Sequence, residues 1–125
     1  MAISVQYNLT GAGWSECIVE IGDQQAHLIA SYLSDALADL LDAVTDLVRG
    51  ADEVTASFTE EPGEYRWRFR RVPQDRLCVR ILWFDRNWSA RPDEEGEVIL
   101  EAEADFGRLQ ERLYQHRNEF WQHMD

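Results

Sequence analysis

The sequence contains no lysine, so arginine supplies all 12 of its basic side chains. An arginine-only set of bases is typical of GC-rich coding, which indicates a bacterial source but says nothing about function. Cysteine is also scarce: there are two, Cys17 and Cys78, and they form no C-x-x-C pair. We therefore expect reduced thiols and a cytoplasmic protein.

Long apolar runs are missing as well. No stretch of 18 residues is apolar throughout, and the opening MAISVQYNLT has no basic segment followed by an apolar run. The sequence therefore predicts neither a membrane span nor a signal peptide.

The motifs of common catalytic sites, G-x-S-x-G, G-x4-G-K-[ST] and G-x-G-x-x-G, do not occur. Near the end of the chain, His116 and His123 could share one helical face with Glu119, but the histidines lie two turns apart. That spacing is too wide for the i, i+4 histidine pair of helical zinc sites. We expect no catalytic residue, no metal and no cofactor, and therefore a protein that is not an enzyme.

Acidic side chains outnumber basic ones by 24 to 12, which gives a formal net charge of −12. Such a charge repels nucleic acid and anionic membranes and favours basic partners. The excess is uneven along the chain. Residues 1–63 hold one arginine and eleven acids, residues 64–86 hold seven arginines and three acids, and residues 87–125 hold four arginines and ten acids. The sequence therefore predicts a basic protein as partner, no nucleic acid and no membrane.

With 125 residues and 45% hydrophobic content, the sequence predicts one folded domain over residues 1–125. Period-two alternation of apolar and polar residues predicts seven strands, at about 3–9, 14–21, 25–32, 54–59, 65–70, 77–84 and 97–104. Helical spacing of apolar residues predicts a helix from the N-cap Ser34 to Gly50 and a last helix over 105–124. We expect an α+β fold of order βββ-α-ββββ-α, in which one antiparallel sheet of six to seven strands carries both amphipathic helices on one face.

Alternation in the central strands places a row of arginines on the sheet face opposite the aromatic Trp67 and Phe69. The row consists of Arg66, Arg68, Arg70 and Arg80. The row could bind an anion, an acidic peptide or a nucleic-acid backbone. It could instead form a cross-strand charge ladder with acids of the last strand, which we favour because exposed opposite charges usually pair. Those acids are Glu97, Glu101 and Glu103.

Two further features are candidates for binding a partner. The first is an acidic stripe along one face of the first predicted helix, formed by Asp35, Asp39, Asp42 and Asp46. The second is the long loop 85–96, in which Trp88 lies between Arg86 and Arg91, a composition typical of interface hot spots. The alternatives are a solvated acidic face and a tryptophan folded back over the sheet edge.

Four segments resemble signatures of a family of small uncharacterised bacterial proteins. They read EPGEYRW at 61–67, RPDEEG at 91–96, NLTG at 8–11 with the following Trp14, and SYLSDA at 31–36. No activity is established for that family, so the resemblance implies no catalytic residue. In size, acidity and α+β build the sequence also resembles immunity proteins that neutralise bacterial toxins.

The sequence thus favours a non-catalytic acidic module that binds a basic protein, in an immunity-like or regulatory role. The alternative is a small-molecule or anion-binding protein that uses the arginine row. The sequence leaves the oligomeric state open.

Overall fold

A computed structural model describes residues 3–11, 13–31, 36–60, 62–86 and 91–107 of the chain. These residues form seven strands, one α-helix and a short 3-10 helix. In chain order they are β1 (Ile3–Gly11), β2 (Trp14–Ile21), β3 (Gln24–Ser31), α1 (Ala36–Val48), β4 (Glu53–Glu60), β5 (Gly63–Val72), β6 (Arg76–Phe84), η2 (Asp93–Glu95) and β7 (Glu97–Asp105). The predicted order of elements is therefore confirmed up to β7.

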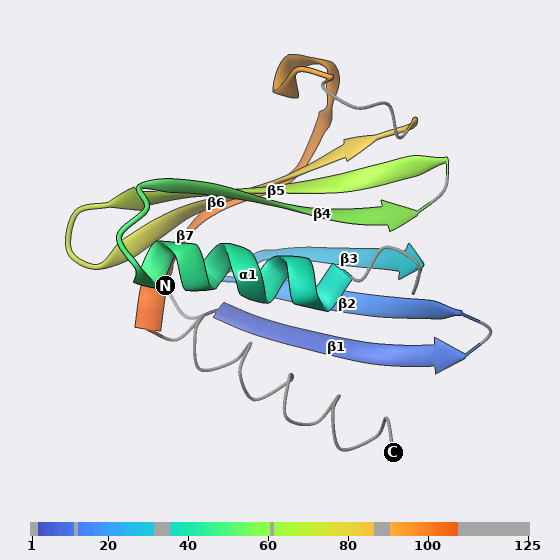
Figure 1. The fold of residues 1–125 in the computed structure, drawn as a ribbon, viewed down its shortest axis with the longest axis horizontal. Helices are drawn as coiled ribbons and strands as arrows, with labels where there is room; N and C mark the ends of the chain where they lie inside the picture. Colours follow the sequence, from blue (N-terminus) through green and yellow to red (C-terminus); the bar gives the residue numbers. More distant parts are fainter. Residues whose placement is uncertain (1–2, 12, 32–35, 61, 87–90, 108–125) are drawn as a thin grey trace.

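The strands form two antiparallel sheets, one of order β1-β2-β3 and one of order β4-β5-β6-β7. The prediction of a single sheet covered by two helices is wrong. Short turns join neighbouring strands within each group, except for the longer connection 85–96 between β6 and β7. The helix α1 separates the two groups, and β3 and β4 do not pair. Figure 1 shows the two sheets one above the other, with α1 alongside them next to β4.

The second predicted helix, over 105–124, begins with helical residues 106–107. The rest of it, with the candidate ligands His116, Glu119 and His123, lies outside the described residues. Among the described residues, α1 is therefore the one complete α-helix.

One hydrophobic core lies between the two sheets and α1. It includes Val19 and Leu28 from the first sheet, Leu40 from α1, and Trp67 and Phe69 from the second sheet. Each strand contributes alternate residues because successive side chains point to opposite faces of a sheet. The two inner faces bury each other, which explains why the chain forms two small sheets instead of one wide sheet.

The stripe predicted on α1 is buried at Leu40, Leu41, Val44 and Leu47, but Val48 at the helix end is 48% exposed. The α1 C-terminus is held by Arg71 of β5, whose guanidinium donates a hydrogen bond to the Leu47 carbonyl oxygen. A cation at this end of a helix is favourable because the unpaired carbonyl groups there carry partial negative charge.

A side chain from the first sheet covers the free edge of the second. Gln24 at the start of β3 donates from Nε2 to the Glu101 carbonyl oxygen at 2.6 Å and accepts from the Glu101 N–H at 3.1 Å. The amide thus satisfies both backbone groups of one edge residue, as a neighbouring strand would. This contact fixes β7 against β3.

Near the end of β6 the side chains keep the faces that alternation predicts, but their burial differs from the prediction. The sequence predicts Trp83 inside and Leu82 and Phe84 outside, but Leu82 and Phe84 are the buried residues and Trp83 is half-buried. The register with β7 shifts between Ile81 and Leu82. Leu82 and Phe84 lie on the outer face of the second sheet and form no part of the main core. They are buried there because the segment after β6 folds back over that face.

Candidate functional site

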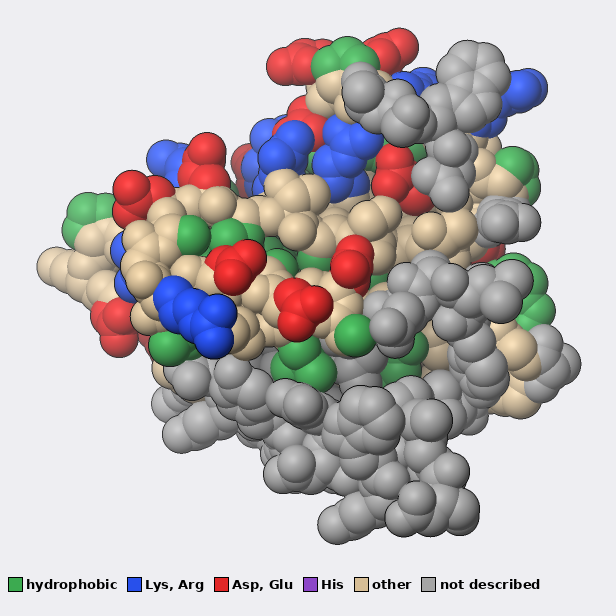
Figure 2. Space-filling model, in the orientation of Figure 1, with side chains coloured by type: hydrophobic (Ala, Val, Ile, Leu, Met, Phe, Trp, Pro, Cys, Tyr) green, Lys and Arg blue, Asp and Glu red, His purple; other side chains and the backbone are tan. Residues whose placement is uncertain are grey.

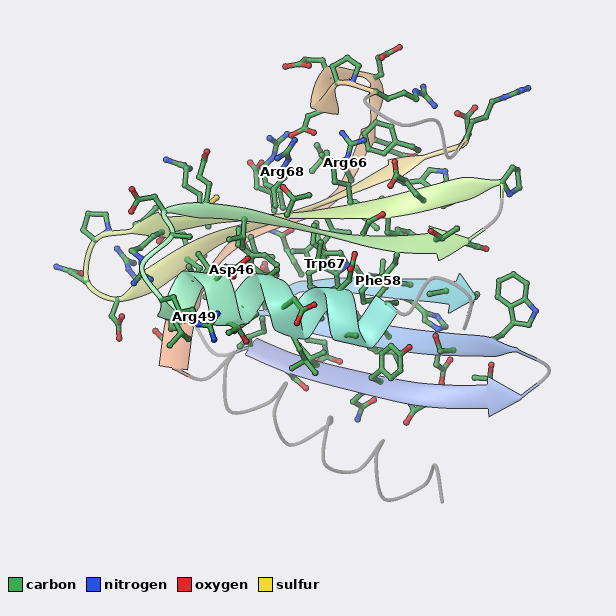
Figure 3. The ribbon with its side chains drawn as sticks, viewed as in Figure 1. Asp46, Arg49, Phe58, Arg66, Trp67 and Arg68 are labelled. Atoms are coloured by element: carbon green, nitrogen blue, oxygen red, sulfur yellow. The ribbon has the colours of Figure 1, made fainter. Side chains whose placement is uncertain are left out.

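The outer face of the second sheet carries the predicted arginine row, which the register confirms. Arg66, Arg68 and Arg70 alternate with the buried Trp67 and Phe69 along β5. Figure 3 shows Arg66 and Arg68 on the outer side of the sheet, with Trp67 directed toward the core. The four arginines of the row differ in what they contact.

Arg66 is buried and anchors the segment that follows β6. Its Nη1 donates to the Arg91 carbonyl oxygen at 2.6 Å and to Asp93 Oδ1 at 2.9 Å. Its Nη2 donates to Glu64 Oε1 at 3.3 Å, and its guanidinium lies 4.2 Å from the Phe84 ring centroid. These contacts occupy the guanidinium, so Arg66 holds the fold together at this point.

Arg68 completes the same cluster through Asp93. Its Nε and Nη2 donate to the two carboxylate oxygens of Asp93 at 2.9 and 3.0 Å, and Nη1 donates to Thr55 Oγ1 at 2.7 Å. Burial would raise the pKa of Asp93, but hydrogen bonds from Arg68 and Arg66 outweigh burial and lower it. Asp93 is therefore ionised and bridges two arginines.

The predicted charge ladder forms in part. Arg80 Nε lies 2.7 Å from Glu101 Oε2, and Arg76 Nη1 lies 3.0 Å from Glu103 Oε2. Glu97 lies opposite Trp83 and forms no ion pair with a described residue. The shift in register near Leu82 breaks the regular pairing between this end of β7 and the arginine row.

Arg70 is the exception in the row. Its side chain is exposed and forms no ion pair with any other described residue. It lies opposite Glu53 on β4 and Cys78 on β6. Next to it the sheet face has a hollow of about 530 Å³. The hollow is lined by Glu53, Val54, Arg68, Phe69, Arg70, Cys78, Arg80, Asp93 and Glu101. The predicted anion site thus reduces to a hollow in which one arginine is unpaired.

The acidic stripe on α1 is partly used by the fold. Asp39 accepts a weak hydrogen bond, at 3.4 Å, from the Ser57 N–H at the free edge of β4. Asp42 and Asp46 are exposed and form no ion pair with any residue that the structure describes. Figure 2 shows acidic side chains along the front surface over α1, and Figure 3 shows Asp46 near Arg49. Asp35 lies outside the described residues.

The loop candidates also differ from one another. Arg91 is half-buried, donates to Asp85 Oδ1 at 3.0 Å, and lies 5.4 Å from the Phe84 ring centroid. The hydrogen bond from Arg91 lowers the pKa of Asp85. Arg86 is exposed, and Trp88 lies outside the described residues. Arg91 therefore has a structural role, and its role in binding stays a prediction.

Sequence reasoning missed the importance of Asp93 and Phe84. Asp93 lies in the segment 91–96, and the Phe84 ring lies against Arg66 of the segment 61–67. These two segments carry the resemblance to a bacterial family. Gly63 and Gly96 approach the end of β6 so closely that an added Cβ at Gly96 would lie 2.7 Å from Phe84 Cζ. The available signal in the sequence was that both segments combine glycine with charged residues. Nothing in the sequence predicts that the two segments contact each other.

No group of three or more histidine, cysteine, aspartate or glutamate side chains among the described residues is arranged to hold a metal ion. Within the same residues, no helix is both long and apolar enough to cross a membrane.

Comparison with known proteins supports the fold. One chain of the CdiA-CT/CdiI toxin and immunity complex from Enterobacter cloacae matches with a TM-score of 0.58 and 12% sequence identity. The match covers 94% of this chain and 98% of that chain. No family model and no curated protein matches the sequence. The fold thus matches a chain of a toxin and immunity complex, while the likeness to immunity proteins in particular and the resemblance to a family of small bacterial proteins stay predictions.

Proposed function

We propose that this chain is a non-catalytic protein-interaction module that binds a basic protein in the cytoplasm, in an immunity-like or regulatory role. The partner surface that we propose is the exposed side of α1 around Asp42 and Asp46. The segment around Arg86 and Trp88 would extend that role as a second contact region.

The observation that carries this proposal is the division of charge between the two faces. On the outer face of the second sheet, Arg66, Arg68 and Arg80 are each matched by an acid. On α1, Asp42 and Asp46 have no ion-pair partner among the described residues. Part of the excess negative charge is therefore carried on α1 by unpaired carboxylates, which suit a positively charged partner.

The position of Asp46 adds to this argument. It lies in the last turn of α1, where the partial negative charge of the helix end disfavours an acid. An exposed side chain that opposes the local electrostatics of its helix gains nothing for folding. Contact with a basic partner would remove this penalty, which is a reason for an acid at this position.

The fold likeness supports the same class of function. The matching chain comes from a toxin and immunity complex, so this architecture occurs in a protein that assembles with another protein. At 12% identity the likeness extends to the fold alone, and the partner of this chain has to be found by experiment.

The test compares two baits of equal net charge. One bait carries Asp42→Asn and Asp46→Asn, and the control carries Asp23→Asn and Asp52→Asn, which are exposed acids outside α1. Both are used with the wild-type protein to capture proteins from the source cells at low salt, followed by identification by mass spectrometry. We expect a basic protein that binds the wild type and the control but not the α1 variant.

The captured protein is then purified and its affinity measured by calorimetry across a salt series. Affinity for the wild type should fall as salt rises, because exposed charges are screened over a Debye length of about 8–10 Å. The proposal fails if no protein distinguishes the α1 variant from the control, or if the affinity is independent of salt.

A further inference from the structure

Glu53 and Arg70 carry opposite charges and face each other directly across β4 and β5. Opposite charges in such cross-strand positions usually interact favourably. Here both side chains are exposed, and neither forms an ion pair with a described residue. Because Glu53 and Arg70 are not paired with each other, one carboxylate and one guanidinium remain available to a ligand.

Both Glu53 and Arg70 line the hollow on the outer face of the second sheet. Its volume of about 530 Å³ lies within the range of about 300–1,000 Å³ typical of small-molecule sites. The structure therefore combines an unused pair of opposite charges with a concavity large enough to hold a compact molecule.

The other charges of the hollow restrict which ligand fits. Arg68 and Arg80 lie opposite each other on β5 and β6, and each is matched by an acid, Asp93 and Glu101 respectively. With Arg70 and Glu53 included, three arginines face three acids, so the lining has no net formal charge. A polyanion would meet three carboxylates there, and a polycation would meet three guanidinium groups.

We propose that this hollow binds a compact zwitterion, a molecule of the amino-acid class, whose carboxylate pairs with Arg70 and whose ammonium pairs with Glu53. The guanidinium can hold a carboxylate through two parallel hydrogen bonds, which fixes the orientation of the ligand. Cys78, which lies opposite Arg70 on the same face, supplies a less polar side chain of the lining. This site is separate from α1, so its presence does not depend on the proposed protein partner.

The test uses three zwitterions that differ in the separation of their charges: glycine, 4-aminobutyrate and glycylglycine. Acetate and ethylammonium serve as probes that carry one charge each. Binding to the full chain is followed by NMR through the Nε–H signals of the arginines and by calorimetry. We expect at least one zwitterion to saturate the Arg70 signal and to bind at least about tenfold more tightly than either single-charge probe.

Arg70→Gln and Glu53→Gln are the two site variants, and Arg49→Gln is the control because Arg49 is exposed at the end of α1, away from the hollow lining. Each site variant should weaken binding about tenfold, and the control should bind as the wild type does. All three replaced residues are exposed, and thermal unfolding checks that the variants fold. The proposal is overturned if no zwitterion saturates by about 10 mM, if acetate binds as tightly as the zwitterions, or if the site variants bind like the control.

Discussion

Arg66 on β5 and Asp93 in η2 are 27 residues apart in the sequence, yet Arg66 Nη1 donates to Asp93 Oδ1 at 2.9 Å. The side chain of Arg66 is 11% exposed and that of Asp93 is 21% exposed, so water screens this ion pair only weakly. The pair fastens η2 over Phe84 and closes the outer face of the second sheet at one end. Asp93 also lines the hollow that contains Arg70.

Replacing Arg66 with methionine should destabilise the protein strongly, by about 3 kcal/mol. The change keeps most of the side-chain volume but leaves the buried carboxylate of Glu64 without its cation. The matched variant Arg68→Met should cost about 1 kcal/mol, because that side chain is 45% exposed. Urea unfolding of both variants measures the difference, and equal losses would contradict the anchoring role of Arg66.

Stability should depend on the ionisation of Asp93. Burial opposes ionisation, but hydrogen bonds from Arg68 and Arg66 outweigh it and lower the pKa of this carboxyl in the folded state. A lowered folded-state pKa means that the carboxylate stabilises the fold fully above its unfolded pKa of about 3.9. The stabilisation is then lost as the pH falls through the folded pKa.

Comparison of the wild type with Asp93→Asn isolates this contribution. The difference in unfolding free energy should be constant from pH 7 down to about pH 5 and should shrink as the pH falls below about 4. Urea unfolding at a series of pH values measures it. A difference that grows toward acid pH would show that the arginines do not stabilise the ionised form.

Gly63 should not tolerate a side chain. A Cβ at this position would contact the Trp83 ring and lie 2.6 Å from the Phe84 carbonyl oxygen, a backbone atom that cannot move aside. Gly63→Ala should therefore cost about 1–3 kcal/mol. Gly107→Ala is the control, since no atom of the described residues lies within 4 Å of its Cβ, and it should not destabilise the protein. Thermal or urea unfolding distinguishes the two, and similar stabilities would mean that β6 can shift.

The two thiols should react at different rates. Burial raises the pKa of the Cys17 thiol to about 12, so this thiol has almost no thiolate at pH 8. Cys78 is partly exposed at the hollow. Iodoacetamide at pH 8 should therefore alkylate Cys78 in the folded protein, and both cysteines only in denaturant. Peptide mapping by mass spectrometry locates the label, and rapid native labelling of Cys17 would show that the first sheet opens.

The local pattern was sufficient to place the arginine row. Period-two alternation separates Arg66 and Arg68 from Trp67 and Phe69 whatever sheet they join, because successive side chains point to opposite faces. The same rule places Leu82 and Phe84 on the outer face, but it does not predict that they are buried there. Burial of Leu82 and Phe84 depends on a later segment that folds over them, and alternation within one strand carries no information about such a cover.

The sequence by itself determined the strands, the position of α1, the outward direction of the arginines and the acidic character of the chain, since each follows from local spacing or from composition. Only the tertiary structure decided that the strands divide into two sheets. It also decided that Asp93 pairs with Arg66 and Arg68 while Arg70 has no ion-pair partner among the described residues. Local spacing decides which face a side chain takes. Which distant segment meets that face depends on how two sheets and a helix bury their apolar surfaces together.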